Sequence, residues 1–255
     1  MEDPDRIPVI TAAKRTPQGK DNGAFSDVRS EDLSTAVIEE LLKETGVEPG
    51  HVQDLMWGVA QQRSEQDANV ARVIALLSPL GEETPATTIN RWCASSMQAI
   101  MSAADAIRAG QRTCIIAGGV ENMSRVPMDS MPYGELHPDL AERYDIPSLE
   151  MGMTAEKVSE KYDISRNAQD QYALRSHQRA AEATNSGRFD AEIVPIETGS
   201  EVIKEDEGIR RDTSLEKLES LPPVFKGDGT VTAGNSSQIS DGAAGLLVTS
   251  ETFAR

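Results

Sequence analysis

The strongest constraint on the fold is the alternation of strand-like and helix-like segments in the first half of the chain. Short runs rich in β-branched or apolar residues alternate with segments of helical periodicity. The strand patterns cover residues 6–13, 52–60, 84–90 and 113–119. The helix patterns cover residues 30–46, 69–77 and the segment that follows Cys93. Strict alternation predicts an α/β fold, a mostly parallel sheet covered by helices.

The first helix pattern carries its own start and stop signals. Ser30 is a candidate N-cap, and Leu33, Val37 and Leu41 lie on one face at helical spacing. Gly46 follows, as expected at a helix C-terminus. After Cys93 a second apolar set predicts a buried stripe, formed by Met97, Ile100, Met101, Ala104 and Ile107.

The pattern changes at about Ser124. Residues 124–140 combine Pro, Met and polar residues without periodicity, and helices are predicted after Thr154 and from Ser165 to about Asn185. Residues 189–197 read as a strand, and residues 230–251 run from a polar loop into an apolar strand. We therefore expect residues 1–123 and 229–255 to form the α/β domain, with residues 124–228 inserted as a loop (cap) domain.

Charge and composition exclude several classes of protein. The chain has 42 acidic and 25 basic residues and a net charge of −17, which argues against nucleic-acid binding. No apolar run is long enough to cross a bilayer and no secretory signal is recognisable, so we expect a cytoplasmic protein and no membrane partner. Arg far outnumbers Lys, as is typical of acidic halophilic proteins; an ordinary acidic bacterial protein is the alternative.

The two cysteines indicate which kinds of chemistry the chain could carry out. Two cysteines do not form a disulfide framework, and three scattered histidines give no zinc spacing, so we expect neither a metal site nor a cofactor. Cys93 stands where a helix begins, and the unpaired amides of a first helical turn favour a thiolate nucleophile. An inert packing cysteine is the alternative at that position. Cys114 lies in an apolar strand and is expected to be structural.

Four segments in this order resemble the thiolase family, the acetyl-CoA acetyltransferases and 3-ketoacyl-CoA thiolases. They are the nucleophile segment at 89–100 (INRWCASSMQAI), the segment at 118–128 (GGVENMSRVPM), the loop-domain segment at 151–158 (MGMTAEKV) and the segment at 231–251 (VTAGNSSQISDGAAGLLVTSE). The resemblance spans most of the chain and implies a thiolase-like N-terminal domain. Ketoacyl synthases and hydroxymethylglutaryl-CoA synthases share the fold and the cysteine but not the second and fourth segments.

The resemblance implies a reaction and a set of site residues. Cys93 would accept the acyl group of an acyl-CoA, and a second acyl-CoA would then be condensed to a 3-ketoacyl-CoA, or the reverse cleavage would occur. For coenzyme A, Ala233 and Ser237 would line the pantetheine arm, Met151 would border the acyl end, and Arg210 would lie near the adenine and phosphate end.

The resemblance also implies elements that cannot be found here, namely an Asn-Glu segment, a Gly-His-Pro histidine and a Cys-x-Gly cysteine of a second α/β half. His51, His137 and His177 are interpreted as bystanders. We therefore expect the C-terminal thiolase half to be absent, the chain alone to be inactive in condensation, and an apolar face to be exposed.

Two explanations of this absence stay open: a fragment of a longer enzyme, which we favour, or a split thiolase completed by a second chain. A homodimer or homotetramer is expected from the family. A non-catalytic CoA- or lipid-binding protein with a thiolase-like fold is the competing hypothesis, and the presence of Cys93 argues against it.

Overall fold

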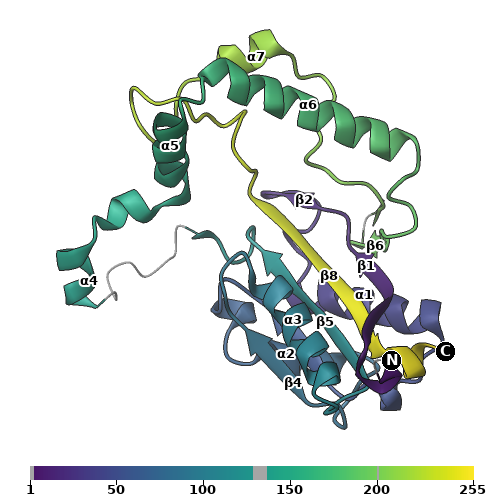
Figure 1. Ribbon diagram of the computed structural model, residues 1–255. Coiled ribbons are helices and arrows are strands. Elements are labelled where there is room, and N and C mark those ends of the chain that lie inside the picture. Colours follow the sequence, from purple (N-terminus) through teal and green to yellow (C-terminus); the bar gives the residue numbers. More distant parts are fainter. Residues whose placement is uncertain (1–2, 129–136, 200) are drawn as a thin grey trace. The chain divides into compact units, whose positions relative to one another are not determined.

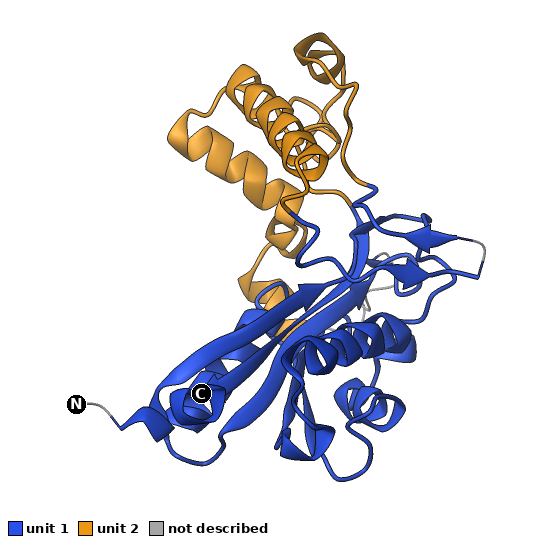
Figure 2. Cartoon of the chain, turned by 90° about the vertical axis from the view of Figure 1, so that its right-hand side faces the viewer, with its two compact units in different colours: residues 1–128, 189–207, 239–255 blue, residues 129–188, 208–238 orange. Residues whose placement is uncertain are grey.

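The computed structural model describes residues 3–128, 137–199 and 201–255. The chain divides into two compact units, coloured separately in Figure 2. Unit 1 comprises residues 1–128, 189–207 and 239–255, and unit 2 comprises residues 129–188 and 208–238.

Residues 189–207 belong to unit 1 and residues 229–238 to unit 2, whereas the sequence predicted one uninterrupted insertion over 124–228. The first difference has a local cause at Arg15. Its backbone amide donates to the Glu192 carbonyl at 2.9 Å, and its carbonyl accepts the Val194 amide at 2.8 Å. Its guanidinium also pairs with the carboxylates of Glu192 and Asp206, each at 2.7 Å. These contacts attach the returning segment to the sheet.

Unit 1 is built on a six-stranded mixed sheet. Its strands are β1 (Pro8–Arg15), β2 (Gly19–Lys20), β3 (Leu55–Gly58), β4 (Ala86–Ile89), β5 (Cys114–Asn122) and β8 (Ser240–Ser250). The order is β1-β8-β5-β3-β4, with β2 also paired to β8. β3 is parallel to β4 and β5, while β8 is antiparallel to β1, β2 and β5 (Figure 1). Five strands thus share one direction and β8 opposes them, so the sheet is mixed, with parallel pairing confined to β3, β4 and β5.

Helices cover both faces of this sheet, because successive side chains of each strand point to opposite sides. Helices α1 (Ser30–Thr45) and α2 (Val70–Leu77) pack in one core with Cys114, Ile116 and Leu247. Helix α3 (Ser95–Arg108) packs in the other core, which includes Ile115 and Val248. The two cores therefore use alternate residues of β5 and β8.

Helix α1 forms largely as its sequence predicts. Leu33, Val37 and Leu41 are fully buried, and Gly46 caps the C-terminus with a left-handed φ of 68°. The N-cap, however, is Arg29, and Ser30 is the first helical residue. The Ser30 hydroxyl donates to the side chains of Glu65 and Gln66, so it anchors a loop rather than its own helix.

The stripe predicted for α3 is wrong in its main members. Met97 and Met101 are 60% and 49% exposed, and the side of α3 that contacts the sheet carries Ala99, Ala103 and Ile107. Small residues face the sheet because the helix start lies very close to the backbone of β3. The methionines occupy the outward face, so α3 exposes apolar surface there.

Unit 2 is mainly helical. Its elements are α4 (Pro138–Arg143), η6 (Ile146–Leu149), α5 (Met151–Tyr162), α6 (Arg166–Asn185) and α7 (Leu215–Glu219). Ser165 caps α6 through its hydroxyl, which accepts the Ala168 amide at 3.3 Å, and the helix has nearly the bounds that the sequence predicts. The Glu156 carboxylate on α5 accepts the backbone amides of Thr230 and Val231, so it holds the loop that follows α7.

The remaining elements are short and belong to unit 1. They are η1 (Pro4–Arg6), η2 (Pro49–His51), η3 (Ser64–Gln66), β6 (Ile196–Glu197), β7 (Val202–Ile203) and α8 (Glu251–Ala254). The strand predicted over 189–197 is thus reduced to β6, paired with β7, and an isolated bridge between Ile193 and Arg15. None of the described helices is both long and apolar enough to cross a membrane.

Candidate functional site

Cys93 lies in the short connection between β4, which ends at Ile89, and α3, which begins at Ser95. Strands β3, β4 and β5 are parallel, so their carboxyl ends share the sheet edge at which this connection emerges. Ligands of α/β sheets bind outside the carboxyl ends of such strands. Cys93 is solvent-exposed at this edge and is therefore accessible to a substrate.

The connection is a tight turn with an uncommon backbone conformation. Trp92 has a φ of 51°, in the left-handed region that a bulky side chain rarely adopts. Such a conformation costs about 1–3 kcal/mol and persists only where its surroundings impose it. The Trp92 amide donates to Asn90 Oδ1 at 3.0 Å, and its carbonyl accepts the Ser95 amide at 3.0 Å and the Ser95 hydroxyl at 2.5 Å.

The start of α3 faces the same turn. Its N-cap is Ala94, which has no side-chain oxygen to accept the first-turn amides. The amides and the helix dipole therefore favour an anion beside Cys93, either a thiolate or an oxyanion on a bound carbonyl. A Cβ at Gly58 of β3 would lie 2.5 Å from the Ser95 carbonyl carbon, so the strand and the helix start are in close contact.

A half-buried carboxylate supports the neighbouring loop. Glu121 of β5 accepts the Ala60 amide at 2.8 Å and the Gln66 side-chain amide at 2.8 Å. Burial raises the pKa of Glu121 above its usual value, and these hydrogen bonds oppose the rise only in part. Sequence reasoning did not assign Glu121, although it stands in the quoted segment 118–128.

The second cysteine is unsuited to nucleophilic chemistry. Cys114 begins β5 and is fully buried. Burial raises the pKa of its thiol to about 12, because a thiolate would lose its hydration there. The prediction that Cys114 is a packing residue is confirmed.

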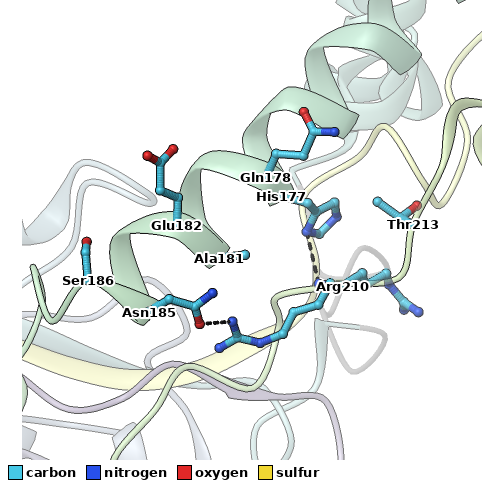
Figure 3. A pocket seen from close by; sticks show the side chains of 9 residues that line it. His177, Gln178, Ala181, Glu182, Asn185, Ser186, Arg210 and Thr213 are labelled. Carbon is cyan, nitrogen blue, oxygen red and sulfur yellow. Dashed lines mark hydrogen bonds between the residues drawn. The ribbon is translucent and has the colours of Figure 1, made fainter.

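Unit 2 contains a pocket of about 510 Å³ (Figure 3). It lies between α6 and the segment after Gly208 and is lined by His177, Gln178, Ala181, Glu182, Asn185, Ser186, Arg210, Arg211 and Thr213. The Arg210 amide donates to His177 Nδ1 at 3.2 Å, and the Arg211 guanidinium donates to Asn185 Oδ1 at 2.6 Å. The lining thus combines two arginines, which can contact an anionic ligand, with one carboxylate, Glu182, and several amide and hydroxyl groups.

His177 is a neutral hydrogen-bond acceptor in this pocket. Burial lowers its pKa below the usual 6.5, and the positive charge of Arg210 lowers it further. His177, which the sequence analysis interpreted as non-catalytic, thus accepts a hydrogen bond from the backbone at Arg210. A histidine in the middle of a helix carries no sequence signal for such a contact.

The four residues predicted to bind coenzyme A all lie in unit 2, and one of them, Arg210, lines the pocket. Met151 starts α5 and is 74% exposed. Ala233 and Ser237 are exposed in the loop after α7, where the Ser237 hydroxyl donates to the Gln238 carbonyl at 3.3 Å. Cys93 belongs to unit 1.

That loop is itself well ordered by hydrogen bonds. Asn235 Oδ1 accepts the Thr232 amide at 2.8 Å, and its amide nitrogen donates to Asp170 of α6 at 3.0 Å. Asp170 is fully buried and also pairs with Arg166. Among the residues that the structure describes, no group of three or more His, Cys, Asp or Glu side chains could hold a metal ion.

The comparison with known families decides the identity of the chain. The family model described as "Thiolase, N-terminal domain" matches residues 8–252. This chain belongs to the thiolase family. The match includes the Cys93 turn and the whole of unit 2.

Individual thiolases agree with this assignment. A 3-ketoacyl-CoA thiolase of Erwinia tasmaniensis is 48% identical over 257 residues, which cover 97% of this chain and 65% of the relative. A probable acetyl-CoA acyltransferase of Staphylococcus aureus is 42% identical and is covered to 67% of its length. The chain thus spans about two thirds of the length of these thiolases.

Solved structures show the same fold. The acetyl-CoA acetyltransferase of Bacillus anthracis superposes with a TM-score of 0.86 at 40% identity, covering 97% of this chain and 66% of that one. Human mitochondrial 3-ketoacyl-CoA thiolase in complex with CoA gives 0.86 at 36% identity, covering 96% and 65%. The α/β prediction and the thiolase resemblance are confirmed.

Proposed function

We propose that Cys93 is the acyl-accepting nucleophile of a thiolase. The observation that carries the proposal is an exposed cysteine on a turn immediately before an uncapped helix start, in a chain of the thiolase family. The Cys93 thiolate attacks the carbonyl carbon of an acyl-CoA thioester, and a new S–C bond forms. The bond to CoA then breaks, the CoA sulfur leaves as a thiolate and takes up a proton, and the acyl group stays on Cys93.

Exchange of one thioester for another suits this position. The two thioesters are nearly equal in energy, so the acyl group stays activated for a second step. The negative charge that develops on the carbonyl oxygen during attack would be stabilised by the positive end of the α3 dipole. The second step would be attack by a deprotonated acyl-CoA to give a 3-ketoacyl-CoA, or its reverse, cleavage by CoA.

The CoA nucleotide is proposed to bind at the pocket of unit 2. A volume of about 510 Å³ falls in the usual range for small-molecule sites. Arg210 would contact the phosphate end, Ala233 and Ser237 the pantetheine arm, and Met151 the acyl end. The charge of the guanidinium groups supports this, because CoA is strongly anionic and the protein carries a net charge of −17.

Acylation of Cys93 is the half-reaction proposed for the chain as it stands. Condensation also requires a proton acceptor and donor at the carbon beside the carbonyl, and inactivity of this chain alone in that step stays a prediction. Dimer or tetramer formation and a cytoplasmic location are part of the same proposal.

The test compares the two thiols in one sample. The chain is incubated with acetyl-CoA, alkylated with iodoacetamide, and digested for mass spectrometry. We expect an acetyl group on Cys93 and loss of its alkylation, with Cys114 unlabelled in every sample because it is buried. A C93S variant serves as the control for adduct formation.

Two outcomes would contradict the proposal. If Cys93 and Cys114 are both alkylated slowly and equally, Cys93 is not a reactive thiol. If CoA binds but no acetyl adduct forms on Cys93, the chain is a CoA-binding protein without acyl transfer.

A further inference from the structure

We infer that Asn90 is a positioning residue for the nucleophile, holding the turn that places Cys93 at the start of α3. The inference rests on the proposed function for its consequence in acyl transfer, while its structural part can be tested without any CoA ester. Asn90 acts through Trp92 and Ala60 and is not itself proposed to touch the substrate.

The Asn90 side chain joins two backbone segments at the sheet edge. Its amide nitrogen donates to the Ala60 carbonyl at 3.0 Å, just beyond the end of β3. Its amide oxygen accepts the Trp92 amide at 3.0 Å, two residues further along the chain. A carboxamide carries a donor nitrogen and an acceptor oxygen on separate atoms, so Asn can make both contacts at once.

The Trp92 contact explains how the left-handed residue is maintained. An Asn side chain that accepts the amide two residues on mimics a backbone turn and stabilises the chain reversal that follows. Ser95 fixes the other end, because its hydroxyl accepts the Arg91 amide at 2.8 Å and donates to the Trp92 carbonyl. The turn that carries Cys93 is thus held by side-chain hydrogen bonds on both sides, from Asn90 before it and from Ser95 after it.

The Ala60 contact ties the turn to the buried part of unit 1. The Ala60 amide donates to the Glu121 carboxylate of β5, and the Ala60 carbonyl accepts from Asn90. Glu121 is thus connected to the turn through Ala60, which hydrogen-bonds to both Glu121 and Asn90. A second contact joins the turn to α3, because the Arg91 guanidinium donates to the Gln98 side chain. Loss of Asn90 would release the turn from Ala60 and Glu121 and free the Trp92 amide.

The expected consequence is a thiol that spends less time against the first-turn amides of α3. The dipole of a helix start stabilises a nearby anion enough to change a process that forms one about two- to five-fold. We therefore expect N90A to slow alkylation of Cys93 by about two- to five-fold near pH 7. At about pH 10.5, well above the usual pKa of a solvent-exposed thiol, the variant and the wild type should react equally.

The experiment measures iodoacetamide labelling of Cys93 by mass spectrometry at both pH values, with Cys114 as the internal reference for unfolding. Variants are N90A, N90S and, as the matched control on the exposed side of β4, T87A. A serine hydroxyl can accept the Trp92 amide but cannot also reach Ala60, so N90S should fall between wild type and N90A. Hydrogen exchange should show the Trp92 amide protected in the wild type and exchanging faster in N90A.

The inference is overturned if N90A labels Cys93 at the wild-type rate near pH 7, or if it is slowed equally at both pH values, which would indicate steric occlusion. If N90A also exposes Cys114, the fold has loosened and the N90S variant is used for the test instead. Slower labelling of Cys93 together with faster exchange of the Trp92 amide in N90S supports the inference. Faster exchange of that amide at an unchanged labelling rate contradicts it. If N90A slows alkylation while acetyl-CoA never acylates Cys93, the proposed function fails and the positioning role stands.

Discussion

Replacing Gly58 by Ala tests whether close contact between β3 and α3 fixes the site. An added Cβ would lie 2.5 Å from the Ser95 carbonyl carbon and 2.9 Å from Ser95 Cβ, and it would also clash with the Ser96 amide nitrogen. Carbon atoms in ordinary contact are about 3.5–4.0 Å apart, so the helix start or the strand must move by about 1 Å. The clashing atoms are mostly backbone and cannot rotate away.

Overpacking of this kind typically costs about 1–3 kcal/mol of unfolding free energy. For a unit of this size that corresponds to a fall in Tm of about 2–12 °C. Because the moved atoms are the start of α3, we also expect Cys93 to lose alkylation rate near neutral pH.

Thermal unfolding followed by circular dichroism measures the first effect, and iodoacetamide labelling measures the second. The matched control is G50A, where an added Cβ meets nothing within 4 Å and φ is ordinary. G50A should leave Tm unchanged or raise it slightly, since alanine restricts the unfolded chain. A G58A protein that melts at or above the wild-type temperature would refute the reasoning.

Two further predictions concern unit 2. E156Q should lower the unfolding free energy by about 1–3 kcal/mol near pH 7, measured by urea titration, because the NH₂ that replaces Oε2 cannot accept the Thr230 amide or hydroxyl and the retained oxygen accepts without a charge; equal midpoints would contradict this. Burial works to raise the pKa of Glu156, but those hydrogen bonds lower it below the usual 4.5. The unfolded chain therefore takes up its proton first as pH falls, so the stabilisation is present above pH 4.5 and is lost below it, where the wild type and E156Q should converge. R210Q should weaken CoA binding about tenfold in titration calorimetry, whereas R175Q, on the same unit but outside the pocket, should not; equal effects would argue against the pocket.

Some elements could be predicted because local sequence decides them. Leu33, Val37 and Leu41 can face only one way on an amphipathic helix, and Gly46 allows the left-handed end. Helix α3 was harder, since it has two faces that could be called apolar. Spacing alone favoured the one with Met97 and Met101, whereas contact with a glycine-bearing strand requires the one with small residues.

The candidate site could also be predicted only in part. A cysteine before a helical pattern, in a recognisable segment, pointed to Cys93. The contribution of Asn90 depends on an Ala60 carbonyl thirty residues earlier, and that of His177 on an Arg210 amide thirty-three residues later. Neither partner leaves a local signal in the chain.

The sequence by itself therefore determined the alternation of elements, the position of the cysteine at a helix start and the family. Only the tertiary structure decided that β8 runs against five other strands, that residues 189–207 return to the sheet at Arg15, and that Trp92 adopts a left-handed conformation. The physical reason is range. Periodicity, caps and turn residues act over a few positions, whereas strand direction and a strained turn depend on hydrogen bonds between segments far apart in the chain.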